Sequence, residues 1–333
     1  AMNRAQSHRG PDDEGYVYID TERHSSELSG SSAVTGAWLA AGGPDTPEKL
    51  GLPNFDTVRS EQFDLVLASR RLAILDLTPS GHMPMAYANG RYWLAYNGEI
   101  YNYRELRVEL EALGHAFKSG ADTEVLLAAY AEWGVDCLPR LNGMFGFALW
   151  DGERRRLVLA RDRFGIKPLY YHLTSSERDG PRLLFASEIK ALIQHPELAR
   201  IPNDKIIFDY LTLGLTDHSS ETFFEGVLSL PPGHLMVVSS DAPAPTIQRW
   251  WQAEINPSVQ THPAEKQHKI HQECAELLED SIRLRLRSDV AVGSCLSGGL
   301  DSSAVVTLAN RLLRKESVVA PGETVGMIAA QSI

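Results

Sequence analysis

A loop rich in glycine and serine near the end of the sequence is suited to binding phosphate groups. Residues 297–303 read SGGLDSS and stand between an apolar run, VAVGSCL, and a helix-forming stretch. Glycine lets the backbone approach a ligand closely, and the first turn of a helix offers unpaired N–H groups at the positive end of its dipole. Asp301 adds a carboxylate for Mg²⁺, although the loop lacks the lysine of a Walker-type phosphate loop. The simpler alternative is a serine-capped helix that follows a glycine turn.

A second group of polar residues, in the first half of the sequence, is suited to holding an amino acid. Arg71 offers a guanidinium for a carboxylate, and Glu99 and Asp122 offer carboxylates for an ammonium group. The Asn97 amide and the Gly98 N–H make a pair of donors for an oxyanion. Each has a simpler alternative: a surface cation for Arg71, a turn for Asn97-Gly98 and a helix N-cap for Asp122. Taken together, they complement an amino acid with a side-chain amide.

These residues stand near the ends of predicted strands and helices, which must bring them together. Strand-like apolar runs cover residues 63–69, 71–75, 91–96, 143–150, 156–160, 168–173 and 182–187. Apolar residues recur at helical spacing from Asn102 to Leu113, and a second helix with such spacing starts at Asp122. Many strands with few helices favour stacked sheets covered by helices. We expect residues 21–62, which are rich in Ser, Gly and Pro, to form a surface insertion.

The pattern changes after about residue 240. Turn-forming stretches are followed by a long amphipathic helix at residues 263–287, a buried strand at 290–296, the phosphate-type loop and a helix at 303–313. The sequence therefore predicts this division: a first domain at 1–240, a linker at 241–262, the start of a second domain at 263–316 and a tail of uncertain origin at 317–333.

Composition excludes several classes of protein. With 333 residues and 43% hydrophobic content, the chain has the size and composition of a two-domain globular protein. A net charge of −11 argues against nucleic-acid binding, which needs clustered Lys and Arg. Three cysteines are too few for a disulfide framework and favour a reducing compartment. Since no apolar run is long enough for a membrane span and the first residues do not resemble a signal peptide, the expected location is the cytoplasm.

Nine segments resemble, in this order, those of the glutamine-hydrolysing asparagine synthetases: HRGPDDEG, RRLAILD, YNGEIYNYRELR, SGADTEVLLAAY, LNGMFGFALWD, ARDRFGIKPLYY, FASEIKAL, LPPGH and SGGLDSS. The resemblance covers about residues 7–315. It implies an α+β fold, in which an αββα sandwich of the N-terminal-nucleophile type precedes the start of an α/β domain like that of ATP pyrophosphatases. It also implies an ATP-dependent transfer of the glutamine amide nitrogen to aspartate, which gives asparagine, AMP and pyrophosphate.

The resemblance assigns a role to each candidate residue. Arg71 would hold the glutamine α-carboxylate, Glu99 and Asp122 the α-ammonium, and Asn97 with Gly98 the oxyanion. The glutamine-binding segment then continues through Leu72, Ala73, Ile74 and Leu75. ATP and pyrophosphate would contact Leu296, Ser297, Gly298, Gly299, Leu300, Asp301, Ser302 and Ser303, with Asp301 as the Mg²⁺ ligand. The implied partners are glutamine, aspartate and ATP; no nucleic acid or membrane is expected, and a homodimer is a candidate assembly.

The nucleophile of that family is a cysteine at the mature N-terminus, whose α-amino group serves as the base. This sequence has no cysteine before Cys137, and we expect Cys137, Cys274 and Cys295 to pack in cores. The chain is therefore expected to be a truncated copy that does not hydrolyse glutamine by itself.

Two alternatives remain open: a glutamine-binding pseudoenzyme, and a relative similar to β-lactam synthetases that forms an amide with another carboxylate. The second domain is expected to be poorly folded, with proteolysis after about residue 260. Its last residues, PGETVGMIAAQSI, resemble a segment of the largest subunit of multisubunit RNA polymerases. The tail is thus either an ordinary helix end or part of a chimeric reading frame.

Overall fold

The computed structural model describes residues 1–21, 37–41, 64–176, 180–239, 242–254 and 263–316. The chain divides into two compact units, Ala1–Gln252 and Ala253–Ile333. The boundary falls inside the segment that was predicted as a linker. Each unit is described by itself.

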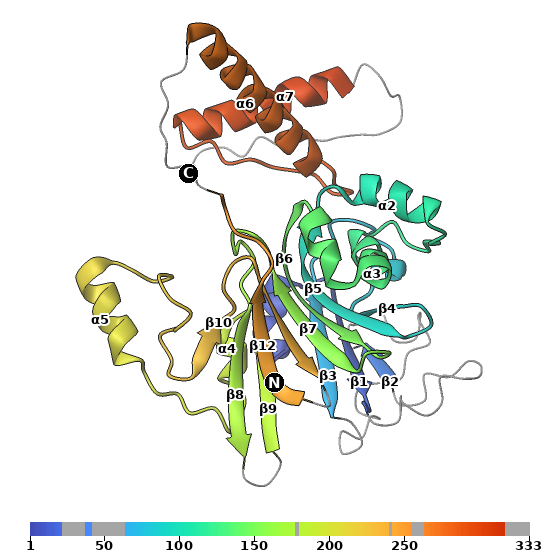
Figure 1. Cartoon of the computed structure of the whole chain (residues 1–333), viewed down its shortest axis with the longest axis vertical. Coiled ribbons are helices and arrows are strands. Elements are labelled where there is room, and N and C mark those ends of the chain that lie inside the picture. The colour runs from blue at the N-terminus through green and yellow to red at the C-terminus, as the bar shows by residue number, and fades with distance from the viewer. Residues whose placement is uncertain (22–36, 42–63, 177–179, 240–241, 255–262, 317–333) are drawn as a thin grey trace. The chain divides into compact units, whose positions relative to one another are not determined.

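The largest sheet of the first unit has six antiparallel strands in the order β12-β11-β7-β6-β5-β4 (Figure 1). The strands are β4 (Met85–Tyr87), β5 (Tyr92–Ile100), β6 (Gly143–Asp151), β7 (Arg156–Arg161), β11 (His234–Ser239) and β12 (Ala242–Arg249). Because successive side chains of a strand point to opposite faces, Leu94 and Tyr96 enter one core while Trp93 and Ala95 pack into another. Both faces of this sheet are therefore covered.

Two helices cover one face of the six-stranded sheet. They are α2 (Tyr103–Ala112) and α3 (Asp122–Trp133), as the apolar spacing predicted. Leu106 and Leu110 of α2 share a core with Leu94 of β5. The residues of α3 from Asp122 to Tyr130 are all buried, because β4, β5, α2 and the 3-10 helix η6 (Gly134–Arg140) surround this helix.

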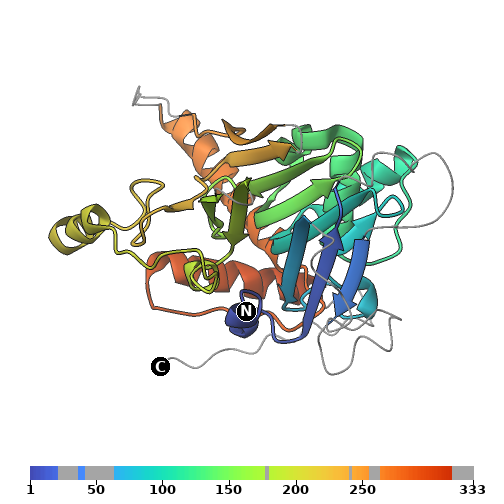
Figure 2. The ribbon, with the colours of Figure 1, turned by 90° about the horizontal axis from the view of Figure 1, so that it is seen from below.

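The other face is covered by two separate three-stranded sheets. One has the order β2-β1-β3, and the other has the order β10-β8-β9. Their strands are β1 (Asp13–Ile19), β2 (Ala37–Ala41), β3 (Leu65–Arg71), β8 (Tyr170–Ser176), β9 (Gly180–Ala186) and β10 (Val227–Ser229). Val17, Leu67 and Tyr171 pack with Trp93 and Trp150 of the large sheet. The predicted stacking of sheets is confirmed, and the blue strands β1–β3 can be followed in Figure 2.

A second, thinner helical layer packs on the far side of β8 and β9. Helix α4 (Ile189–Leu192) buries Ala191 and Leu192 in a small core to which Met2, just before the 3-10 helix η1 (Arg4–Arg9), also contributes. The first unit thus has the expected order of layers, α-β-β-α. Helix α5 (Asp204–Leu213) begins with a side-chain cap from Asn203 and ends at Gly214, whose φ of 69° is the left-handed conformation that favours glycine.

The described part of the second unit contains the helices α6 (Ala264–Arg285) and α7 (Leu300–Glu316). Ile282, Ala309 and Leu312 form its small buried core. The strand predicted at residues 290–296 is not formed. A strand requires a hydrogen-bonded neighbour, and the described residues of this unit include none.

The environments of the cysteines agree only in part with expectation. Cys137 is buried, as predicted. Cys274 and Cys295 are exposed, so the prediction of core packing is wrong for both. The reason is visible on α6, where the apolar face that carries Cys274 is largely uncovered and Leu277 is 71% exposed.

Two further expectations are corrected by the structure. The strand predicted at residues 71–75 is wrong, because β3 ends at Arg71 and a loop follows. Residues 242–249, assigned to the linker, form β12; Pro243 and Pro245 are tolerated there because an edge strand needs fewer N–H donors. The proposed insertion at 21–62 and the tail at 317–333 lie largely or wholly outside the described residues.

Candidate active site

A cavity of about 1480 Å³ lies in the first unit. Its walls include residues of β3, β5, β6 and β9 and residues in and before η1. Eight of the predicted glutamine-site residues line it: Arg71, Leu72, Ile74, Leu75, Asn97, Gly98, Glu99 and Asp122. Ala73 is the predicted contact that does not line it. The structure therefore brings together residues that are up to 51 positions apart, from Arg71 to Asp122.

Arg71 is a buried cation and not a surface residue, with 8% of its area exposed. Its Nη2 donates to the carbonyls of Leu75, at 3.0 Å, and Asp76, and its Nη1 donates to Thr78 O at 3.4 Å. Burial lowers the pKa of Arg71, while Asp13, Asp76, Asp12 and Asp122 counteract that shift. These contacts use three of the five N–H donors of the guanidinium, and within the described residues the other two remain for a carboxylate.

Asp122 joins the start of α3 to the end of β5. Its Oδ2 accepts hydrogen bonds from the Tyr96 hydroxyl and the Ile100 N–H, both at 2.8 Å. Burial raises the pKa of Asp122, and these hydrogen bonds counteract the shift. The N-cap position is Ala121, so Asp122 is not the cap that the simpler alternative required.

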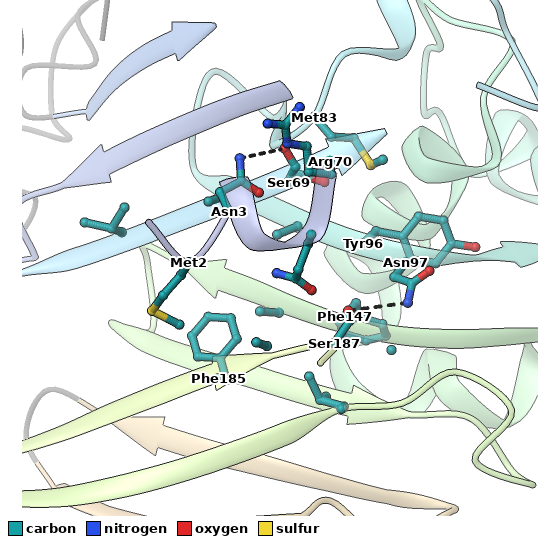
Figure 3. Close-up of a pocket in the computed structure, with 18 of the residues that line it drawn as sticks. Met2, Asn3, Ser69, Arg70, Met83, Tyr96, Asn97, Phe147, Phe185 and Ser187 are labelled. Atoms are coloured by element: carbon teal, nitrogen blue, oxygen red, sulfur yellow. Dashed lines mark hydrogen bonds between the residues drawn. The ribbon is translucent and has the colours of Figure 1, made fainter. Parts of the chain in front are cut away.

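Asn97 and Gly98 lie within β5, which excludes the turn alternative. Asn97 Nδ2 donates to Ser187 Oγ at 3.4 Å, which joins β5 to the residue after β9 (Figure 3). Gly98 must be glycine because a Cβ there would lie 2.3 Å from the Met144 carbonyl oxygen on β6. Strand β6 therefore fixes the position of the Gly98 backbone at the cavity.

Acidic residues of the segment HRGPDDEG hold the walls of the cavity in place. Asp13 Oδ2 lies 2.6 Å from His82 Nδ1, and both side chains are largely buried. Asp12 Oδ2 accepts from the Ala73 N–H at 2.8 Å, and Glu14 pairs with Arg70. The sequence showed that this segment is polar, but it gave no sign of these three partners.

Lys167 and Arg9 also line the cavity, and neither was predicted to do so. Lys167 lies in the loop that follows β7 and Asp162. The Asp162 carboxylate accepts hydrogen bonds from the backbone N–H groups of Phe145, Phe164, Ile166 and Lys167. These bonds fold the loop that brings the Lys167 side chain to the cavity, and local sequence does not reveal this effect.

The predicted phosphate loop belongs to the second unit. Gly298 has a φ of 79°, and Ser297 Oγ lies 3.0 Å from Ser302 Oγ at the start of α7. All the residues from Leu296 to Asp301 are exposed, while Ser302 and Ser303 are half-buried. Hydroxyls, a helix start and a glycine in the left-handed region suit a polyphosphate. Among the described residues no group of three or more His, Cys, Asp or Glu could hold a metal ion.

None of the three cysteines lines the cavity. Burial raises the pKa of the Cys137 thiol to about 12, which makes this thiol a poor nucleophile. Within the described residues, no helix has both the length and the apolarity to cross a bilayer.

Comparisons with known proteins identify the family of the chain. Residues 53–251 match the family described as glutamine amidotransferase domain, and residues 273–324 match the family described as asparagine synthase. The chain is 37% identical to asparagine synthetase [glutamine-hydrolyzing] 3 of Bacillus subtilis over 82% of this chain and 42% of the relative. Identity to the B. subtilis protein named asparagine synthetase [glutamine-hydrolyzing] 1 is 38%, over 72% of this chain and 36% of the relative.

Among solved structures, one titled as the allosteric regulatory enzyme of purine biosynthesis matches with a TM-score of 0.49 and 18% identity, over 76% of this chain and 46% of that chain.

The fold and the matched residues define the first unit as a glutamine amidotransferase domain. The chain belongs to the family of glutamine-hydrolysing asparagine synthetases. It spans about two fifths of the length of these curated relatives.

Proposed function

We propose that the cavity of the first unit binds glutamine as the nitrogen donor of an asparagine synthetase. One observation supports this proposal most strongly: a buried guanidinium, two carboxylates and an amide, from separate segments, line one cavity. Arg71 would bind the α-carboxylate, and Glu99 and Asp122 would bind the α-ammonium. The Asn97 amide and the Gly98 N–H would stabilise the oxyanion.

The chemistry proposed for this site is amide hydrolysis through a thioester. A cysteine thiolate attacks the carboxamide carbon, the C–N bond breaks and ammonia leaves. Water then cleaves the thioester to give glutamate. Ala1, Met2 and Asn3 line the cavity, and Asn3 Nδ2 donates to Ser69 O at 3.4 Å, so a residue joined ahead of Ala1 would enter it (Figure 3).

We propose that the second unit contributes to the synthetase reaction, in which aspartate is activated by ATP and receives the ammonia. Residues Leu296 to Ser303 would hold the phosphates, and Asp301 would take part in binding Mg²⁺. Support comes from the match of residues 273–324 and from the geometry of the loop.

Calorimetry on this chain tests the glutamine site. We expect L-glutamine to bind, and we expect Arg71→Met to weaken binding by about 100-fold, because each lost hydrogen bond to a charged group costs about 1.5–3 kcal/mol. Arg140→Met is the matched control, since Arg140 is exposed and pairs with Glu109 away from the cavity. Equal affinities for both variants, with unchanged melting temperatures, would contradict the assignment.

Hydrolysis is tested with the same chain and with a version extended by Met-Cys-Gly ahead of Ala1. The chain as printed should bind glutamine without releasing ammonia, as in the pseudoenzyme alternative. The extended version should release ammonia after removal of its methionine, and alkylation of the new thiol should abolish that release. An extended version that binds glutamine but releases no ammonia would favour the pseudoenzyme.

A further inference from the structure

Lys167 lies near Asn97, where the side-chain amide of glutamine is expected to bind. Residues Asn97 and Gly146 face each other on β5 and β6. A Cβ built on Gly146 would lie 3.8 Å from Lys167 Cβ, so the lysine covers this strand pair. Even-numbered residues of β6, such as Ala148 and Trp150, pack on the cavity side of the sheet, as Gly146 does. Lys167 therefore lies on the same face as the Asn97 amide.

The arginines that line the cavity have hydrogen-bond or ion-pair partners. Arg9 pairs with Glu188, Arg70 with Glu14 and Arg182 with Glu197. Arg71 donates to the carbonyls of the loop that follows it.

The ammonium of Lys167 differs from these groups. It makes no hydrogen bond or ion pair with another residue in the part of the chain that the structure describes. Burial lowers the pKa of Lys167 and nearby Arg9 lowers it further, while Glu99 and Asp162 counteract the shift. A half-buried cation that makes no direct ion pair has lost hydration that a negatively charged ligand group would replace.

We propose that Lys167 is a specificity-determining residue that recognises negative charge at the side-chain end of the ligand. This inference rests on the proposed glutamine site. Negative charge appears at this end of the ligand in two forms. The first is the oxyanion of the reaction, and the second is the γ-carboxylate of the product glutamate. Glutamine carries a neutral amide at that end, so Lys167 distinguishes product from substrate.

The charge of Lys167 should affect the binding of glutamate and of glutamine differently. A charged group attracts a carboxylate far more strongly than an amide, particularly where the surroundings exclude water. Removing the charge should therefore weaken the binding of glutamate and leave the binding of glutamine almost unchanged. A residue that only packs the wall would affect both ligands equally, since they have nearly the same shape.

Calorimetric titration of the full chain with L-glutamine and with L-glutamate tests the inference. Lys167→Met keeps most of the packing of the stem and removes the charge. We expect it to weaken glutamate binding by about tenfold, the effect of one hydrogen bond to a charged group, and glutamine binding by less than about twofold. Lys167→Arg should retain the affinity for glutamate. Lys205→Met is the control, because Lys205 is exposed and pairs with Glu221 outside the cavity.

The ratio of the two dissociation constants decides the outcome. A ratio that stays the same in Lys167→Met, or that changes as much in Lys205→Met, overturns the inference while the glutamine site stands. If the chain binds no glutamine at all, the proposed function itself fails. Should Lys167→Met fold poorly, Lys167→Gln provides the same comparison with a neutral polar side chain.

Discussion

At the scale of single residues, the position of Arg71 depends on the absence of a side chain at Gly81. A Cβ built on Gly81 would lie 2.0 Å from Arg71 Nη2 and 2.5 Å from its Cζ. The guanidinium must therefore move if residue 81 carries even a methyl group. This movement would break the hydrogen bonds to the carbonyls of Leu75 and Thr78 and displace the guanidinium from the proposed glutamine site.

We predict that Gly81→Ala weakens glutamine binding by about tenfold or more. In the Arg71→Met background the same substitution should have almost no effect, because the pair is coupled through one contact. Calorimetry on the four variants of this cycle measures the coupling. Gly120→Ala is the control, because a Cβ there would make only an ordinary contact at 3.7 Å with Asp76. Additive effects of Gly81→Ala and Arg71→Met would argue against a role in positioning.

At the scale of elements, Glu188 joins η1 to α4. Its carboxylate accepts from His8 at 2.8 Å and from Arg9 at 3.0 Å, and Lys190 Nζ lies 3.0 Å away. Burial acts to raise the pKa of Glu188, but the hydrogen bonds from Lys190, Arg9 and His8 dominate and lower it to about 2. Glu188 thus ties the wall of the cavity that contains Arg9 to α4.

We expect Glu188→Gln to lower the free energy of unfolding by about 2 kcal/mol at pH 7, as partly exposed ion pairs contribute less than buried ones. A carboxylate with a depressed pKa stabilises the folded state above its unfolded pKa and loses this effect as the pH falls through the folded value. The difference in the free energy of unfolding between Glu188→Gln and the unchanged chain should therefore shrink as the pH falls from about 4.5 to about 2. Thermal melts from pH 7 to pH 3 measure this, with the exposed Glu197→Gln as control. A difference that does not depend on pH would contradict the assignment.

Elements could be predicted from sequence where they depend on local patterns and not on distant partners. Helices α2 and α3 were predicted because their apolar spacing is local. The strand expected at 71–75 fails because the Arg71 side chain draws three later carbonyls around itself, an effect of side-chain partners and not of propensity. The five candidate residues from Arg71 to Asp122 were predicted from their complementary chemistry, and they line one cavity. Lys167 was missed because its place depends on the bonds that Asp162 makes to the loop.

At the scale of the whole molecule, the candidate glutamine site belongs entirely to one unit. Every residue that lines the cavity lies between Ala1 and Ser239, and the first unit spans Ala1–Gln252. This unit contains the three larger cores and all the described strands. The described part of the second unit buries only a small core on two helices, and Leu277 and Leu300 are exposed there.

We therefore predict that a chain that ends at Gln252 folds and binds glutamine with the affinity of the full chain, within about twofold. The free energy of binding comes from contacts within the first unit, and removing the second unit leaves these contacts intact. Calorimetry gives the affinity, and thermal melting shows whether the shortened chain keeps its cooperative transition. A shorter version that ends at residue 240 is the matched control. It removes β12, which covers the edge of β11, and should melt at a lower temperature because β11 becomes an unpaired edge. If the chain that ends at Gln252 folds but binds glutamine much more weakly, the second unit must contribute to the site, and the assignment of the cavity to one unit is wrong.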